Sequence, residues 1–241
     1  MKRLVAVAIC AIAIGAIVLG AYLAGLFSSE DTPYEPVIDP VDFSGPIDNP
    51  YYPLIPGTTF VYEGVSEDGA ERNEMQVTNN TKVIVGVTCV VVWDRVWLND
   101  DLVEETYDWY AQDTDGNVWY FGEDSREIAN GVVVSAEGSW EAGVDGAQPG
   151  IVMLADPDVG HEYRQEYYKG EAEDMAKVLA LNASVSVPYG AYDNCLQTED
   201  WTPLEKGVAE HKFYVPGIGL VKELQIEGGS GHMDLVSIST S

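Results

Sequence analysis

The chain has 241 residues, with 40 Asp and Glu against 12 Lys and Arg, which gives a formal net charge of -28 at pH 7. This charge excludes nucleic acid as a partner, because binding to phosphates needs basic patches. A hydrophobic content of 46% and six Trp exclude a disordered chain. Dense carboxylates repel one another less at high ionic strength, so the composition is compatible with a salty habitat.

The N-terminus predicts a membrane segment. Lys2 and Arg3 precede an uncharged run from Leu4 to Phe27, which spans roughly 30 Å or more as a helix, enough for a bilayer core. The basic flank predicts that this end stays in the cytoplasm and that the rest of the chain lies outside. A cleaved signal peptide is the alternative. Since the exterior part is acidic, it should not dock onto anionic headgroups, and the helix is expected to be the sole membrane contact.

The composition divides the chain into three parts. Residues 1–27 are the predicted transmembrane anchor or signal. Residues 28–50 are rich in Pro, Asp and Glu without a hydrophobic period, which predicts a solvated linker. Residues 51–241 form one extracytoplasmic domain, long enough to bury one core.

Strand signals dominate from Thr58 onward. Short β-branched and aromatic runs alternate with turn dipeptides, as is typical of β-hairpins. Helix signals are scarce. We therefore predict an all-β fold, an antiparallel meander that forms a half-barrel or barrel and is preceded by one N-terminal transmembrane helix.

Two dipeptides, at residues 99–100 and 115–116, predict hairpin turns, because Asn, Asp and Gly accept positive φ. If both turns have two residues, the cross-strand pairs are Trp97 with Leu102, Arg95 with Glu104, Trp93 with Thr106 and Tyr110 with Phe121. Side chains alternate along a strand, so one sheet face should combine aromatic and charged groups: Trp93, Trp97, Tyr110, Trp119 and Phe121 with Arg95 and Glu104. A register error of one residue would scramble this face.

This aromatic face is the leading candidate for a ligand surface. Part-exposed Trp and Tyr with polar neighbours suit sugar rings or apolar ligands, because they offer flat apolar area with a polar edge. The alternative is a second core layer, covered by the Gly-rich loop of residues 143–158 or by another sheet.

The exterior part contains two cysteines, Cys89 and Cys195. In an oxidising compartment they could form a disulfide. Since both lie in apolar strand-like segments, two buried free thiols are the alternative. The spacing of Cys and His residues predicts no zinc site.

Two acidic groupings carry weaker hypotheses. The oxygen donors of residues 113–117 suggest calcium, although a hairpin turn also explains them. Glu137, Glu141 and Asp145 flank Trp140 and could supply the paired carboxylates of a glycosidase. With 40 acids in the chain, such groupings are expected by coincidence. No metal and no cofactor are predicted.

Several segments resemble a widespread family of uncharacterised secreted or membrane-anchored bacterial and archaeal proteins. They lie at residues 49–62, 108–124, 138–143 and 213–221, and the likeness covers about residues 49–225. More loosely, the Pro-Gly-x-x-Phe-x-Tyr opening and the Tyr-x-Pro-Gly-x-Gly-Leu-Val closing are similar to half-open β-barrel lipoprotein carriers. The resemblance implies an antiparallel barrel outside the cytoplasm and brings no activity with it.

The predicted function is a non-catalytic binding or carrier module, tethered to the cell membrane by a single pass with its domain outside. Its ligand is expected to be apolar or carbohydrate-like. A structural cell-envelope protein without a small ligand and a polysaccharide hydrolase are the alternatives. An open aromatic groove would indicate the carrier, and two carboxylates roughly 5–10 Å apart in a cleft would indicate the hydrolase.

Overall fold

The computed structural model describes residues 34–241, so the predicted anchor at residues 1–27 lies outside the described residues. Apart from one short 3-10 helix, η1 (Pro40–Asp42), the regular elements of residues 34–241 are β-strands. In this part of the chain, no helix has the length and apolar character needed to cross a membrane. The predicted all-β class is confirmed for these residues.

The strands form one sheet of 15 strands, in which all the pairings are antiparallel. Their bounds are β1 (Thr58–Ser66), β2 (Gly69–Ile84), β3 (Val87–Leu98), β4 (Asp101–Gln112), β5 (Val118–Ala129), β6 (Val132–Ser135), β7 (Trp140–Glu141), β8 (Gln148–Met153), β9 (Glu162–Arg164), β10 (Glu166–Tyr167), β11 (Met175–Val187), β12 (Gly190–Trp201), β13 (Ala209–Val215), β14 (Gly219–Glu227) and β15 (His232–Thr240).

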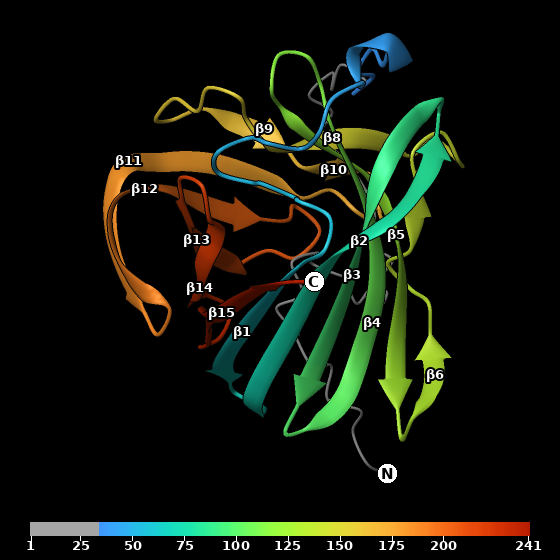
Figure 1. Cartoon of the computed structure of the whole chain (residues 1–241). Coiled ribbons are helices and arrows are strands. Elements are labelled where there is room, and N and C mark those ends of the chain that lie inside the picture. Colours follow the sequence, from blue (N-terminus) through green and yellow to red (C-terminus); the bar gives the residue numbers. More distant parts are fainter. Residues whose placement is uncertain (1–33) are drawn as a thin grey trace.

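The sheet is a nearly closed, barrel-like meander. Its strand order is β10-β8-β5-β4-β3-β2-β1-β15-β14-β13-β12-β11-β9, with β6 and β7 paired to β5. β9 pairs with β11 and β10 pairs with β8, and only Gln165 separates β9 from β10 in the chain. One short segment therefore ties together the two ends of the curled sheet (Figure 1).

The hairpin between β3 and β4 confirms one predicted turn and corrects the register beyond it. Asn99 and Asp100 both have positive φ, 51° and 72°, and Trp97 pairs with Leu102 as predicted. A bulge between Val96 and Trp97 then shifts the pairing by one residue. In consequence Arg95 pairs with Glu105 instead of Glu104, and Trp93 pairs with Tyr107 instead of Thr106.

The turn between β4 and β5 is wider than the predicted two residues. Asp113 N–H donates to the Asn117 carbonyl at 3.0 Å, and Tyr110 pairs with Tyr120 instead of Phe121. The Asp113 carboxylate accepts from the Asn117 backbone N–H at 2.8 Å and from Trp119 Nε1 at 2.7 Å. Its oxygens therefore close the turn, as the hairpin-turn explanation of this stretch expects.

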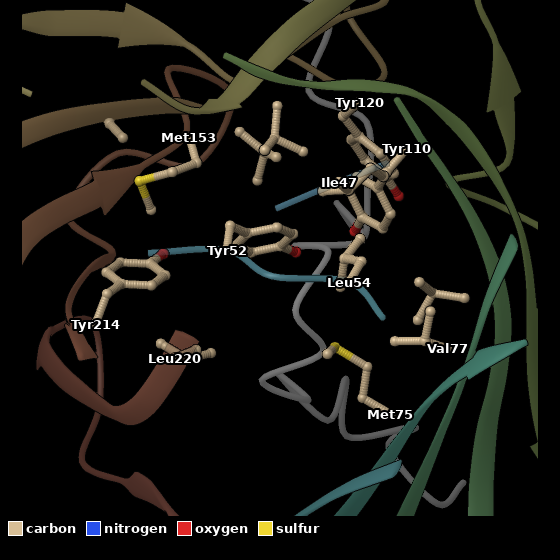
Figure 2. Close-up of a cluster of buried hydrophobic side chains, with 14 of the residues drawn as sticks. Ile47, Tyr52, Leu54, Met75, Val77, Tyr110, Tyr120, Met153, Tyr214 and Leu220 are labelled. Carbon is tan, nitrogen blue, oxygen red and sulfur yellow. The ribbon is translucent and has the colours of Figure 1, made fainter. Parts of the chain in front are cut away.

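The segment of residues 46–57 contributes buried side chains to the interior of the curled sheet. Tyr52 and Leu54 lie between Tyr214 and Leu220 on one wall and Tyr110 on the other (Figure 2). Filling the space between the walls this way buries apolar area from both arms of the sheet in one core.

Residues 34–50, which the composition assigns to a linker, also contact the fold. Ile47 and Asn49 are buried, and the ring of Phe43 packs edge-on against Trp119 and Phe121. Isolated apolar residues among Pro and Asp form no periodic pattern, so the sequence does not reveal that this stretch packs.

Asn49 holds three backbone groups in place. Its Nδ2 donates to the carbonyls of Gly116 at 2.9 Å and Leu154 at 3.0 Å, and its Oδ1 accepts from Tyr51 N–H at 2.9 Å. We expect Asn49→Ala to lower the free energy of unfolding by about 2–4 kcal/mol, because buried carbonyls lose their donor. Urea unfolding measures this change. The exposed Asn80 supplies the control, since Asn80→Ala should stay within about 0.5 kcal/mol; equal losses would contradict the role of Asn49.

Cys89 and Cys195 are buried free thiols. Cys89 lies on β3 and Cys195 on β12, and β2, β1, β15, β14 and β13 stand between these two strands in the sheet. The structure thus has the free-thiol alternative and not the disulfide. Burial raises the pKa of the Cys89 thiol to about 12, so this group is not a reactive thiolate at neutral pH.

Candidate functional site

The outer wall of the sheet carries a strip of aromatic and charged side chains. Trp93, Arg95 and Trp97 alternate along β3 with the buried Asp94 and Val96, so these three side chains face outward. The ring of Tyr107 on β4 lies beside Trp93, with the ring centroids 6.1 Å apart and the planes 2° from parallel. We call this set the outer strip; its members are Arg72, Glu74, Trp93, Arg95, Trp97, Glu105, Tyr107, Asp124 and Arg126.

Guanidinium groups stack on the rings along the outer strip. Arg95 lies 3.9 Å from the ring centroid of Trp93 and 5.4 Å from that of Trp97. Arg72 lies 5.1 Å from the Trp97 centroid, and Arg126 lies 5.6 Å from the Tyr107 centroid. Cation–π contacts of this kind orient both partners, so they hold the side chains of the strip in one arrangement.

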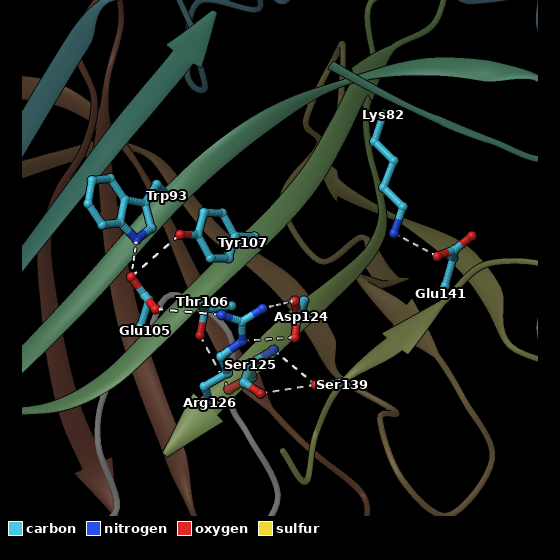
Figure 3. A network of polar contacts seen from close by, with 10 residues as sticks. All are labelled: Lys82, Trp93, Glu105, Thr106, Tyr107, Asp124, Ser125, Arg126, Ser139 and Glu141. Atoms are coloured by element: carbon cyan, nitrogen blue, oxygen red, sulfur yellow. Dashed lines mark hydrogen bonds and ion pairs between the residues drawn. The ribbon is translucent and has the colours of Figure 1, made fainter. Parts of the chain in front are cut away.

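Carboxylates neutralise the arginines of the outer strip. Arg95 pairs with Glu74 at 2.7 Å, and Arg126 pairs with Asp124 at 2.7 Å. Figure 3 shows Glu105 accepting from Trp93 Nε1 at 2.9 Å. The strip contains three Arg and three acids, whereas the whole chain carries a net charge of -28. It is therefore a locally neutral area on a strongly acidic protein.

Four of the residues predicted for the aromatic face are not part of the outer strip. Glu104 and Tyr110 point to the inner side with their strand neighbours Thr106 and Asp108, because the bulges moved the register of β4. Tyr120 points inward to Asp108, so its neighbours Trp119 and Phe121 point to the outer face. There the ring of Phe43 packs against both of them, and they are separate from the outer strip. The prediction placed Trp93, Arg95 and Trp97 together correctly. It missed Tyr107, Arg72 and Arg126, which only the true register reveals.

The interior of the sheet carries a second feature, a group of buried charges. Nine carboxylates and one lysine are buried within residues 34–241: Glu71, Asp94, Asp108, Glu123, Glu166, Asp174, Asp200, Glu210, Glu223 and Lys212. Burial of a charge is costly unless it is paired or neutralised by a proton. The burial of these acids could not be predicted from the sequence, because both faces of β12 to β14 contain apolar residues.

Lys212 is the cation of this interior group. Its Nζ lies 3.5 Å from Asp200 Oδ2 and 3.7 Å from Glu223 Oε1. Burial alone would lower the pKa of Lys212, but Glu223 and Asp200 outweigh it and hold the pKa well above its usual value. Burial raises the pKa of Glu223 to about 8 despite the nearby lysine. The interior at neutral pH therefore contains one ammonium group among carboxyls, several of which retain a proton.

The cavity in this interior is small. It has a volume of about 20 Å³ and is lined by Tyr52, Tyr110, Tyr120, Glu166 and Lys212 among others. A space of this size holds one water molecule and no larger ligand. In residues 34–241, no group of three or more His, Cys, Asp or Glu has the arrangement needed to hold a metal ion.

A shallow groove lies at the end of the β12–β13 hairpin. It has a volume of about 450 Å³, and its lining includes Trp201, Val208 and Ile226 together with Glu205 and Lys206. This volume falls in the range of ligand pockets. No motif in the sequence predicted this groove. Because it is separate from the outer strip, it can serve as a control site in binding experiments.

The carboxylates considered for glycosidase chemistry have different surroundings. Glu137 and Asp145 are exposed, whereas Glu141 pairs with Lys82 at 2.7 Å. Trp140 between them is buried and donates to Glu166 at 3.0 Å. None of these three acids lines the interior cavity or the groove at the β12–β13 hairpin.

No protein-family model matches this chain, and no curated protein matches it either. Two solved structures are similar to it in fold. A protein of Bacteroides fragilis, named as exported and as having a YmcC-like fold, has 14% identity over 79% of this chain and 99% of its own, with a TM-score of 0.48. A protein of Parabacteroides distasonis, named as a lipoprotein, has 12% identity over 78% of this chain and 98% of its own, with a TM-score of 0.42. At these values the likeness carries no argument about function.

Proposed function

We propose that the chain is a non-catalytic binding module, held outside the cytoplasmic membrane by its N-terminal segment, and that the outer strip binds an extended carbohydrate. One observation supports this above all. Three of the four arginines in residues 34–241 gather on the strip, where they stack on Trp93, Trp97 and Tyr107. The chain has a net charge of -28, and on the strip the arginines reduce the repulsion that an acidic ligand would meet elsewhere.

The chemistry of the strip suits sugars that carry carboxylates. Part-exposed aromatic rings offer apolar area for the C–H faces of sugar rings. Guanidinium groups bind carboxylates in a planar, two-bonded arrangement. The strip follows an outer wall, and neither Trp93 nor Trp97 lines the interior cavity or the groove at the β12–β13 hairpin. An open wall accommodates a polymer better than a small molecule, so we favour a uronate-containing polysaccharide over an enclosed cargo.

A structural role in the envelope is the second candidate. The observation in its favour is that Arg95 and Arg126 already have carboxylate partners, so the strip is saturated without a ligand. In that case the stacked rings would stiffen the wall and nothing would bind. The two candidates differ in one measurable property, the affinity of the folded chain for polysaccharide.

Trp97→Ala tests the proposed function. We expect the variant to fold and to bind polygalacturonate at least about tenfold more weakly than the parent chain, because one stacking surface is lost. Titration calorimetry in about 0.5 M salt measures this, since that salt screens the repulsion between two polyanions.

Trp201→Ala is the matched control. It removes another part-exposed Trp, in the groove at the β12–β13 hairpin, and should leave the affinity unchanged. If the parent chain binds neither polygalacturonate nor a neutral dextran, the structural role is favoured. If Trp201→Ala alone weakens binding, the ligand belongs in the groove and the outer strip is the wrong site.

A further inference from the structure

One end of the fold presents an exposed apolar tip. Five valines there are 47–93% exposed: Val37, Val41, Val83, Val85 and Val144. They come from three segments that touch, because a Cβ placed on Gly86 would lie 2.9 Å from Pro40 and one on Gly143 would lie 2.5 Å from Val85. Figure 1 shows η1 beside the tip of the β2–β3 hairpin. The segments thus form one apolar surface, which we call the valine tip.

The β2–β3 turn carries an apolar residue where turn chemistry disfavours it. Val85 has φ 42°, a left-handed conformation that is strained for a β-branched residue. The turn that follows β3 uses Asn99-Asp100, and the turn that follows β5 uses Asn130-Gly131. These residue types accept positive φ readily. The strained turn therefore places an exposed valine at a position where a polar residue would fit better.

The chain between the predicted anchor and the fold is short. Tyr34 is already fixed to the fold, since its hydroxyl donates to the Pro149 carbonyl at 3.0 Å and its ring lies 5.5 Å from that of Tyr167. Only residues 28–33 separate it from Phe27, and they span roughly 25 Å at most when fully extended. An anchor that stays in the bilayer would therefore hold this end of the fold close to the membrane surface.

We propose that the valine tip rests in the interfacial layer of the bilayer that holds the anchor. This inference depends on the uncleaved tether of the proposed function. A tether of six residues gives the tip a high effective concentration at the surface, so that weak apolar contacts suffice. The sequence predicts the N-terminal helix as the sole membrane contact, and the valine tip would be a second one. The exposed Asp39 and Asp42 border the tip, so it should prefer zwitterionic to anionic headgroups.

The orientation places the two proposed surfaces apart. The valine tip includes the β2–β3 turn, whereas Trp97 lies next to the β3–β4 turn at the other end of β3. The outer strip would then extend away from the membrane, toward the surrounding envelope. A polymer could reach it without crossing the lipid surface.

Labelling of the full chain in vesicles tests this placement. We would replace Cys10 by Ser, so that an introduced cysteine is the accessible thiol, since Cys89 and Cys195 are buried. An NBD fluorophore would then be attached at Val85→Cys or at Asp100→Cys. In phosphatidylcholine vesicles containing nitroxide-labelled lipid, we expect at least about twofold stronger quenching at position 85 than at position 100. Acrylamide, a neutral quencher, should show the reverse order.

The outcomes separate the two proposals. If the chain floats with the vesicles but both positions respond equally to acrylamide, the valine tip does not touch the bilayer and the tether stands. If the chain does not float with the vesicles, the tether itself is wrong, and the docking of the tip falls with it. Val144→Cys, labelled in the same way, must match position 85 and not position 100, which checks that the whole tip is immersed.

Discussion

The free energy of unfolding is expected to fall as the pH rises from about 5 to about 8. Burial raises the pKa of Asp108 and of Asp174 to about 7 and that of Glu223 to about 8. Over this range the folded chain keeps protons that the unfolded chain has lost. Stability is therefore greatest below the unfolded pKa of about 4 and declines until the pH exceeds the folded values, by up to about 1.4 kcal/mol per unit for each group.

Asp108→Asn isolates one of these groups. Asp108 is buried and accepts from the Tyr120 hydroxyl at 2.7 Å, an interaction that an Asn oxygen can keep. We expect the variant to match the parent near pH 3, below the unfolded pKa, and to be more stable at pH 8, by at most about 4 kcal/mol. Urea unfolding at fixed salt measures both values. The exposed Asp101→Asn is the control for net charge, and an equal gain in both variants would assign the effect to surface repulsion.

Lys212→Met is expected to cost about 3–5 kcal/mol of stability at pH 8, because it leaves buried carboxylates without their cation. Lys212 is 5% exposed, Asp200 is 0% exposed and Glu223 is 3% exposed, so water cannot take over the lost charge. The loss should be smaller at pH 5, where Glu223 holds a proton. Guanidinium chloride would screen the ion pair, so urea unfolding is the suitable measurement.

A triple variant controls for packing. Lys212→Met together with Asp200→Asn and Glu223→Gln removes both signs of charge, and we expect it to regain most of the stability lost in the single variant. Similar losses in the single and triple variants would show that the lysine matters through its volume. A single variant within about 1 kcal/mol of the parent would mean that the interior charges are not coupled as the distances indicate.

The fold could be predicted further than the site. Alternating β-branched and aromatic residues and the Asn99-Asp100 turn indicated an antiparallel meander, and Trp97 does face Leu102. The prediction then lost register at the bulge between Val96 and Trp97. A bulge leaves no periodic trace in a sequence, yet one extra residue moves every later side chain to the other face. This is why Trp93 and Trp97 were placed together correctly while Tyr110 and Glu104 were not.

From the sequence we could predict the β class, the strongly negative net charge and the placement of Trp93, Arg95 and Trp97 on one face, because each follows from composition or from alternation within one strand. The sequence did not reveal that Tyr107 and Arg126 join the outer strip, that Lys212 lies among buried carboxyls, or that Pro40 packs against the β2–β3 turn. These features depend on strand register and on contacts between distant segments, which local patterns do not encode.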